Sequence, residues 1–267
     1  MPELPEVQTV VNTLRPRLLG KTVRAVRLNR RDILTPPDVD LPALLSGHAI
    51  QAIDRRGKRI VFTLDDANRF YLHLGMTGRL TIHALADPLP RHTHLLLDLG
   101  DCELRFNDPR RFGGVWWIGH EKQSDEDMGP EPFRIRPRQL AKRLAKTTRA
   151  IKNALLDQRV IAGLGNIYVD ESLFAAHVHP LTPANLLAPE QVSRLNRAIK
   201  ATLRRALRHR GSTLRDYRDA DGQPGGFQTL HRVYDREGEP CRACRTLIAR
   251  IVLGGRSTHF CPRCQPH

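Results

Sequence analysis

Four cysteines near the C-terminal end constrain the fold of this chain more than any other feature. They form two Cys-x-x-Cys pairs with sixteen residues between the pairs, at Cys241, Cys244, Cys261 and Cys264. Each pair can turn two thiolates toward one ion, and four thiolates complete a closed tetrahedral shell around zinc. Because such a shell leaves no position for a substrate, the spacing predicts one structural zinc ion per chain.

The residues between the two pairs predict a β-hairpin. Residues 247–253 form its first strand, Gly254-Gly255 its turn, and 258–260 lead back, which places Arg256 beside the turn. In a secreted chain the cysteines would instead suggest disulfides, but four paired cysteines in a reducing compartment fit a metal site better. The fifth, Cys102, is expected to be a buried structural thiol.

Charge indicates the class of partner. The 267 residues carry 43 basic and 28 acidic side chains, a formal net charge of +15. Such an excess favours a polyanion, with a membrane surface as the other candidate. No stretch approaches the roughly 20 apolar residues of a membrane span, and the first 30 residues lack a signal-peptide core. We therefore expect a cytoplasmic, nucleoid-associated DNA-binding protein.

The first residues, Met-Pro-Glu-Leu-Pro-Glu, combine a potential nucleophile with two carboxylates. Removal of Met1 would turn Pro2 into a secondary amine, of which about a tenth is unprotonated at neutral pH. Such an amine can attack an electrophilic carbon and form an iminium, with Glu3 and Glu6 close by for proton transfer. Taken alone, the same residues also fit ordinary helix-entry chemistry.

Apolar residues at helical spacing follow from Val7 to Leu14, and short strands then dominate up to residue 118. This density of strands, punctuated by Gly, Pro, Asp and Asn, predicts a β-sandwich or barrel. The predicted strands are 22–28, 50–53, 59–64, 70–74, 80–83, 94–99, 103–106 and 115–118.

Residues 137–210 show helical periodicity instead, including an amphipathic helix from Val192 to Leu207 that Gly211 stops. The opposite face of this helix is basic, either as a solvated surface or as a phosphate contact. Gly-rich residues 211–226 predict a mobile loop, and polar residues 119–136 predict a linker.

Five motifs, in order, resemble those of the bacterial formamidopyrimidine-DNA glycosylases. They are Pro-Glu-Leu-Pro-Glu-Val at 2–7, His-Leu-Gly-Met-Thr-Gly at 73–78, Asp-Pro-Arg-Arg-Phe-Gly at 108–113, Gly-Leu-Gly-Asn-Ile-Tyr at 163–168, and the cysteine module. The resemblance implies an α+β multidomain fold, with an N-terminal β-sandwich and helix, a helix–two-turns–helix domain, and a zinc-finger hairpin. DNA would lie between the two main domains.

The resemblance also implies residue roles. Pro2 would be the nucleophile, Glu3 the acid/base group, Glu6 an orienting carboxylate, and Lys58 a contact to the lesion and nearby backbone. Met76, Arg110 and Phe112 would fill the gap left by an extruded base, which costs a few kcal/mol to unstack. Asn166 and Arg256 would grip phosphates, with His92 and Lys152 as further DNA-binding residues. Gln8 departs from the family, which usually has glutamate there.

The activity implied is that of a bifunctional glycosylase and lyase for oxidised purines such as 8-oxoguanine and formamidopyrimidines, without a catalytic cofactor. The partner is double-stranded DNA, no membrane is involved, and the protein is expected to be monomeric. Two alternatives remain open, an endonuclease VIII-type enzyme for oxidised pyrimidines and a non-catalytic DNA-binding zinc-finger protein. Leu4, the Arg110–Phe112 pair and the long 211–226 loop favour the purine enzyme.

The expected domain boundaries follow from these patterns. Residues 1–118 form the catalytic β-sandwich domain and 119–136 the linker. Residues 137–226 form the helix–two-turns–helix domain with a lesion-capping loop, and 227–267 form the zinc-finger module.

Overall fold

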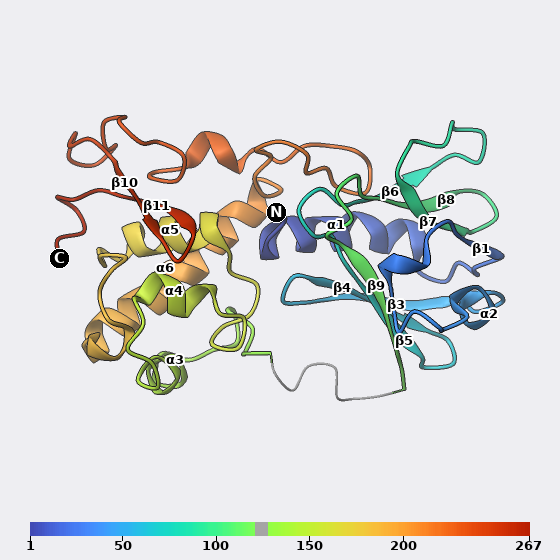
Figure 1. Cartoon of the computed structure of the whole chain (residues 1–267), viewed down its shortest axis with the longest axis horizontal. Coiled ribbons are helices and arrows are strands. Elements are labelled where there is room, and N and C mark those ends of the chain that lie inside the picture. Colours follow the sequence, from blue (N-terminus) through green and yellow to red (C-terminus); the bar gives the residue numbers. More distant parts are fainter. Residues whose placement is uncertain (121–127) are drawn as a thin grey trace. The chain divides into compact units, whose positions relative to one another are not determined.

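The computed structural model describes residues 1–120 and 128–267, and Figure 1 shows its helices and strands. The chain divides into two compact units. One contains Met1–Glu126 and His209–Gly226, and the other contains Asp127–Arg208 and Phe227–His267. Across these described ranges, every helix is too short or too polar to span a bilayer.

Helix α1, Leu4–Leu18, begins the first unit and confirms the predicted N-terminal helix. Glu3 is its N-cap, and the Glu3 amide N–H donates to Glu6 Oε2 at 2.8 Å, which satisfies one of the free donors at the helix start. The helix buries one apolar face, made of Val7, Val10, Val11, Leu14 and Leu18. This face joins the core that both sheets share.

Two sheets form the rest of the first unit and confirm the predicted β-sandwich (Figure 1). Their strand orders are β2-β9-β5-β4-β3 and β1-β7-β8-β6. All eight predicted strands are present. They are β1 Ala25–Leu28, β3 Ile50–Arg56, β4 Arg59–Leu64, β5 Arg69–His73, β6 Arg79–His83, β7 Thr93–Asp98, β8 Glu103–Asn107 and β9 Gly114–Gly119.

Alternation of buried and half-buried residues sets the register of the central strands. In β4 every second residue is buried, and Phe62 pairs with Phe70 of β5, where the two rings stack with centroids 4.8 Å apart. The sequence did not reveal three short elements, η1 Arg31–Ile33, β2 Leu34–Thr35 and α2 Leu41–Leu45. Each is too short to show a period.

The second unit is helical, with a hairpin near its C-terminal end. The predicted amphipathic helix is α6, and the predicted hairpin strands are β10 and β11 with Gly254-Gly255 between them. The elements are α3 Pro137–Leu144, α4 Ile151–Leu156, α5 Asn166–Ala175, η3 Ala184–Leu186, α6 Pro189–Arg208, η4 Phe227–Leu230, β10 Ala249–Leu253 and β11 Arg256–Phe260.

Residues 211–226, expected to be a mobile loop of the helical domain, are instead packed in the first unit. Tyr217 and Ala220 belong to the sandwich core, and the Ile82 N–H donates to the Ala220 carbonyl at 2.9 Å. The Ala220 N–H donates in turn to Thr13 Oγ1 of α1 at 3.2 Å. Two apolar residues in an otherwise polar stretch were the only sequence signal for this packing.

The predicted linker, 119–136, falls partly on residues 121–127, which lie outside the described residues. Its remaining part packs within the second unit. The Gly129 N–H donates to the Gln158 carbonyl at 2.8 Å, and Ile135 is buried. Residues 128–136 are therefore part of a folded unit, and the other predicted boundaries stay predictions.

Candidate active site and nucleic-acid interface

The start of α1 holds Pro2, Glu3 and Glu6 together in the first unit. All three side chains are buried, whereas Met1 is exposed. While Met1 is attached, the Pro2 nitrogen is an amide and cannot act as a nucleophile. Loss of the exposed Met1 would create a secondary amine in the residue next to Glu3.

Both carboxylate oxygens of Glu6 accept backbone hydrogen bonds. Oε2 accepts from the Glu3 N–H, and Oε1 accepts from the Ser212 N–H at 2.7 Å. Gly211 has φ +78°, and a Cβ there would lie 2.5 Å from Glu6 Oε1, so this close approach requires glycine. The Tyr217 hydroxyl also donates to the Glu6 carbonyl at 3.2 Å. Glu6 therefore joins the start of α1 to residues 211–217.

Lys58 lies in the two-residue turn between β3 and β4, where Gly57 has φ +57°. Unlike most lysines in turns, it is buried, with 8% of its surface exposed. Its charge reaches His73 on β5. Burial, together with the Lys58 and Arg59 charges, lowers the pKa of His73 to about 4. At neutral pH the His73 ring is uncharged, and its Nδ1 accepts from the Gly75 N–H at 3.1 Å.

Met76, Arg110 and Phe112 lie on two loops and are exposed. Met76 exposes 42% and Phe112 55% of its surface, and the Arg110 guanidinium carbon lies 4.6 Å from the centroid of the Phe112 ring. Exposed apolar side chains beside a cation are unusual for a purely structural loop. Their chemistry suits stacking against bases and hydrogen bonding to a base edge.

Asp108 ties these two loops together, and the sequence analysis gave it no role. It is fully buried, and its carboxylate accepts from Thr77 Oγ1 at 2.5 Å and from the Gly113 N–H at 2.8 Å. The Arg110 N–H donates to Oδ1 at 3.3 Å. The only local signal was an Asp-Pro turn opener, which does not reveal a partner thirty residues away in sequence.

The loops also meet through their backbones. Gly75 has φ +60°, and a Cβ there would lie 2.3 Å from the Gly113 nitrogen, so only glycine fits. His92 is exposed, has φ +64°, and its carbonyl accepts from the Asp108 N–H at 3.0 Å. The backbone of His92 thus supports Asp108, while its ring remains at the surface.

In the second unit, Asn166 begins α5 after the N-cap Gly165. Its Nδ2 donates to the Ser257 carbonyl of β11 at 2.9 Å, next to Arg256. Arg256 is exposed and follows the Gly254-Gly255 turn, as predicted from the sequence. The structure therefore brings Asn166 and the Arg256 strand together at the N-terminus of a helix, which favours anions.

Lys152 occupies a different position from the one expected of a DNA-binding lysine. It is fully buried, and its Nζ lies 2.7 Å from Asp170 Oδ1 and 2.7 Å from the Ser257 carbonyl oxygen. Asp170 Oδ2 accepts from the His259 N–H at 2.9 Å. A buried lysine must be paired, and this pairing consumes its charge. Lys152 holds the β11 backbone against α5.

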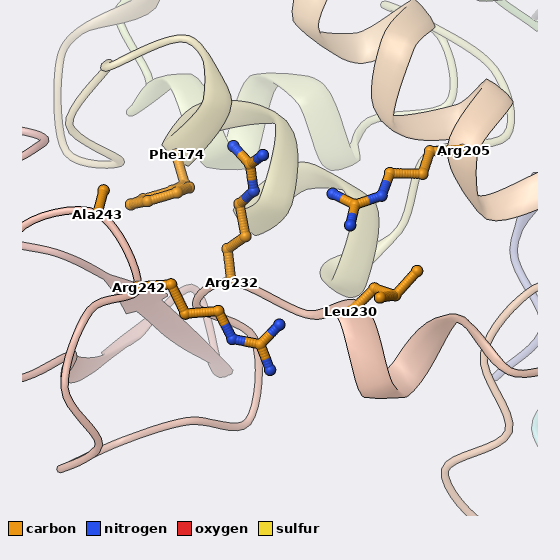
Figure 2. Close-up of a pocket in the computed structure, with 6 residues that line it drawn as sticks. All are labelled: Phe174, Arg205, Leu230, Arg232, Arg242 and Ala243. Carbon is orange, nitrogen blue, oxygen red and sulfur yellow. The ribbon is translucent and has the colours of Figure 1, made fainter.

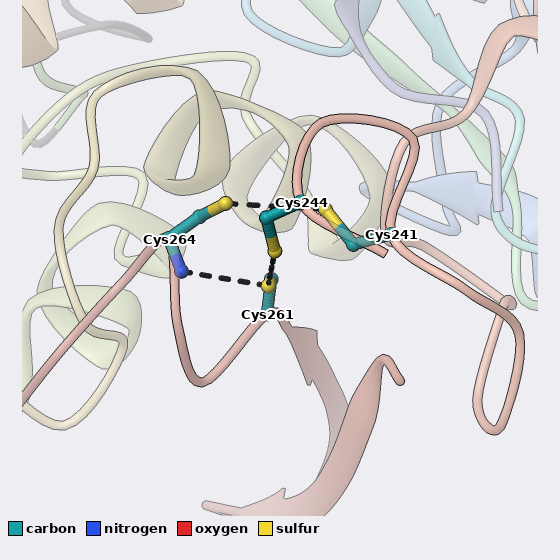
Figure 3. Close-up of side chains that lie close together, drawn as sticks. All are labelled: Cys241, Cys244, Cys261 and Cys264. Atoms are coloured by element: carbon teal, nitrogen blue, oxygen red, sulfur yellow. Dashed lines mark hydrogen bonds between the residues drawn. The ribbon is translucent and has the colours of Figure 1, made fainter. Parts of the chain in front are cut away.

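The four cysteines converge as predicted, and Figure 3 shows them facing one another. Their sulfur atoms all lie within 4.8 Å of one another, with Cys241–Cys264 at 3.9 Å and Cys244–Cys261 at 3.4 Å. Zn–S bonds of about 2.3 Å in a tetrahedron place sulfurs about 3.8 Å apart. The donor set and spacing fit one structural zinc ion.

Comparisons with known proteins cover the same three parts of the chain. Residues 1–115 match the family model of the formamidopyrimidine-DNA glycosylase N-terminal domain, 128–218 that of its H2TH domain, and 238–266 that of a zinc finger found in FPG and IleRS.

Whole-chain relatives carry the same name. Formamidopyrimidine-DNA glycosylase of Chloroflexus aurantiacus is 44% identical over 271 residues, covering 99% of this chain and 98% of that protein. The Bacillus subtilis enzyme of that name is 43% identical over 274 residues, covering 99% of each.

Solved structures agree with the sequence relatives. The MutM (FPG) protein of Thermus thermophilus is 43% identical, with a TM-score of 0.89, covering 99% of this chain and 98% of that one. A Lactococcus lactis FPG mutant in complex with Fapy-dG-containing DNA is 35% identical, with a TM-score of 0.93, covering both chains fully. The motifs, the two units, the cysteine site and these relatives agree, and the chain belongs to the formamidopyrimidine-DNA glycosylase family.

Proposed function

We propose that the chain excises oxidised purines from double-stranded DNA with Pro2 as its nucleophile and then cuts the strand. The activity is that of its family, a DNA glycosylase that is also an abasic-site lyase. MutM has been solved with carbocyclic 8-oxo-G-containing DNA, and the Lactococcus lactis protein with Fapy-dG-containing DNA. The assignment of residues to steps is our proposal.

In the first step the Pro2 nitrogen lone pair forms a bond to C1′ of the damaged nucleotide. The bond between C1′ and the base breaks, and the base leaves with its electron pair and takes up a proton. The buried Glu3 follows Pro2 directly in the chain and serves as the acid/base group for ring opening and proton transfer. The product is an iminium between Pro2 and the opened sugar.

The iminium acidifies the protons at C2′. Loss of one proton expels the 3′-phosphate by β-elimination, and a second proton loss expels the 5′-phosphate by δ-elimination. Both steps need only an acid/base group and the covalent iminium. Zinc takes no part, because four thiolates leave it no free coordination position.

The single observation that carries the assignment is the buried Pro2–Glu3 pair at a helix start fixed by Glu6. Glu6 has both oxygens engaged with the Glu3 and Ser212 N–H groups, so it positions the chain rather than exchanging protons. The exposed Met76, Arg110 and Phe112 side chains support a role in filling the space of an extruded base. Lys58, Asn166 and Arg256 are proposed phosphate contacts.

Borohydride trapping tests the proposal. Protein whose Met1 has been removed, mixed with an 8-oxoguanine duplex and sodium borohydride, should give a covalent complex with the adduct at Pro2 on peptide mapping. Protein that retains Met1 behind an N-terminal tag should bind the duplex but form no complex, because its Pro2 nitrogen is an amide. Glu3→Gln should slow trapping while keeping the size of the side chain.

An adduct at Lys58 or Lys152 would refute the nucleophile. Faster trapping on a duplex with an oxidised pyrimidine than on 8-oxoguanine would favour the endonuclease VIII-type alternative. We further propose that the protein is cytoplasmic and associates with the nucleoid, because its substrate is chromosomal DNA. Fluorescence microscopy of a C-terminally labelled chain tests that proposal.

A further inference from the structure

A cavity of about 300 Å³ in the second unit is lined by three arginines from three segments (Figure 2). Arg205 extends from α6, Arg232 from the segment after η4, and Arg242 from the turn between Cys241 and Cys244. The remaining lining residues are Phe174, Leu230 and Ala243. None of the three arginines has a role in the mechanism proposed above.

The positive charge of this cavity has no acidic partner close by. Among the described residues, no carboxylate oxygen lies within 4.0 Å of the guanidinium nitrogens of Arg205, Arg232 or Arg242. One acid, Glu171, lines an adjoining cavity together with Arg205 and Arg232. Three guanidinium groups around one small volume repel one another unless an anion lies among them.

Glu171 serves the backbone instead. Its oxygens accept from the N–H groups of Arg232, Val233 and Tyr234 at 2.9–3.0 Å, and its side chain is buried. This arrangement fixes the backbone that carries Arg232. Its carboxylate is consequently turned to three amides, and the guanidinium of Arg232 remains available to a ligand.

Two of the arginines are held in place by contacts that leave donors free. Arg242 donates from one terminal nitrogen to the Thr229 carbonyl at 3.2 Å, which leaves its other N–H groups unused by that bond. The Arg232 guanidinium carbon lies 5.9 Å from the ring centroid of Phe174, which is buried and forms one wall of the cavity. The cations are therefore partly preorganised.

We propose that Arg205, Arg232 and Arg242 form a binding site for a phosphate group. Guanidinium groups bind phosphate oxygens through paired hydrogen bonds, and three of them match a tetrahedral dianion. The volume is at the lower end of the range for ligand pockets, which suits a small anion. The phosphate belongs either to the DNA backbone or to a free phosphate species.

The test uses the full zinc-loaded chain and the double variant Arg205→Gln/Arg242→Gln. The control is Arg197→Gln/Arg208→Gln, which makes the same charge change on α6 without altering the cavity. Calorimetric titration with inorganic phosphate at low salt should give binding to wild type and control, and at least about tenfold weaker binding to the double variant. Zinc content and melting temperature confirm folding. If Arg242→Gln loses zinc, Arg205→Gln/Arg232→Gln replaces it.

Duplex binding distinguishes the two sources of phosphate. If DNA supplies it, inorganic phosphate should compete with undamaged duplex, and the double variant should reduce the log–log salt slope by about 0.9 for each contact beyond the control. If the ligand is free phosphate, duplex affinity should equal that of the control. The proposal is overturned if the double variant and the control match in both phosphate and duplex binding. Pro2 trapping is a separate readout, so its loss would count only against the proposed reaction.

Discussion

His73 shows how one buried residue makes a DNA-facing loop sensitive to pH. Its lowered pKa keeps the ring neutral, and the neutral Nδ1 accepts the Gly75 N–H that begins the Met76 loop. Protonation would replace this acceptor with a donor and break the bond. The same burial that shapes the loop therefore limits the pH range in which the loop is ordered.

We expect the first unit to lose stability as the pH falls from about 6.5 to about 4. In that window the unfolded chain binds a proton at His73 and the folded chain does not, so the free energy of unfolding rises with pH. The loss is at most roughly 3 kcal/mol for a pKa near 4 against the usual 6.5. His73→Asn keeps an acceptor without titrating. Urea unfolding at several pH values should show a smaller loss for this variant, and equal losses would contradict the assignment.

Arg110 should set the preference for the base opposite the lesion. Its guanidinium is exposed and rests near the Phe112 ring, from which it can reach acceptors on cytosine. A good base contact is worth about 1–3 kcal/mol of discrimination. Arg110→Ala should therefore narrow the excess of excision opposite cytosine over adenine, measured by single-turnover kinetics. Arg111→Ala, which changes an arginine paired with Asp32, is the neighbouring control.

At the scale of elements, one buried carboxylate determines whether two loops act as a unit. Asp108 receives hydrogen bonds from Thr77 and Gly113, which directly follow Met76 and Phe112 in the sequence. Asp108→Asn replaces one acceptor oxygen with a donor that faces an N–H group. A buried unsatisfied donor costs about 1–3 kcal/mol.

We expect Asp108→Asn to lower the free energy of unfolding by that amount and to weaken binding to lesion duplex. Binding to undamaged duplex should change less, because phosphate contacts lie elsewhere in the chain. Thr77→Val removes a single hydrogen bond and should show a smaller effect on both measurements. If Asp108→Asn bound lesion DNA as tightly as wild type, the carboxylate would not position the two loops.

Across the whole molecule, the two units have separate cores, and zinc belongs to one of them. The sandwich core includes residues of α1 and both sheets, whereas the cysteines pack with Phe174, Val233 and Ile248. Cys261→Ser should therefore abolish zinc binding and loosen residues 238–266, and the loss should extend to the end of α5 through Phe174. Hydrogen exchange should show the sandwich unchanged. Full DNA affinity without the metal would contradict the role of the finger.

The net charge of +15 predicts steep salt dependence for binding to any duplex. Each neutralised phosphate contributes about −0.9 to the log–log slope. A filter-binding titration of undamaged duplex from low to moderate salt should give several such contacts. A slope near zero would contradict a mainly electrostatic affinity.

The sequence alone determined the features that repeat with a local period or a fixed spacing. The eight strands, α1, α6 and the hairpin follow from alternation and helical spacing, because a buried face must recur every two or about 3.6 residues. The four cysteines follow from ligand spacing, because one tetrahedral ion fixes the distance between knuckles. The family followed from five motifs in order.

Only the tertiary structure decided which distant residues share a hydrogen bond. Asp108 with Thr77, Glu6 with Ser212, and Lys152 with Asp170 are partners that no local pattern specifies. The packing of residues 211–226 in the first unit and the burial of Lys152 both differ from the sequence expectation. A polar group is satisfied wherever the folded backbone supplies a partner. That pairing depends on three-dimensional proximity, which a periodic pattern does not encode.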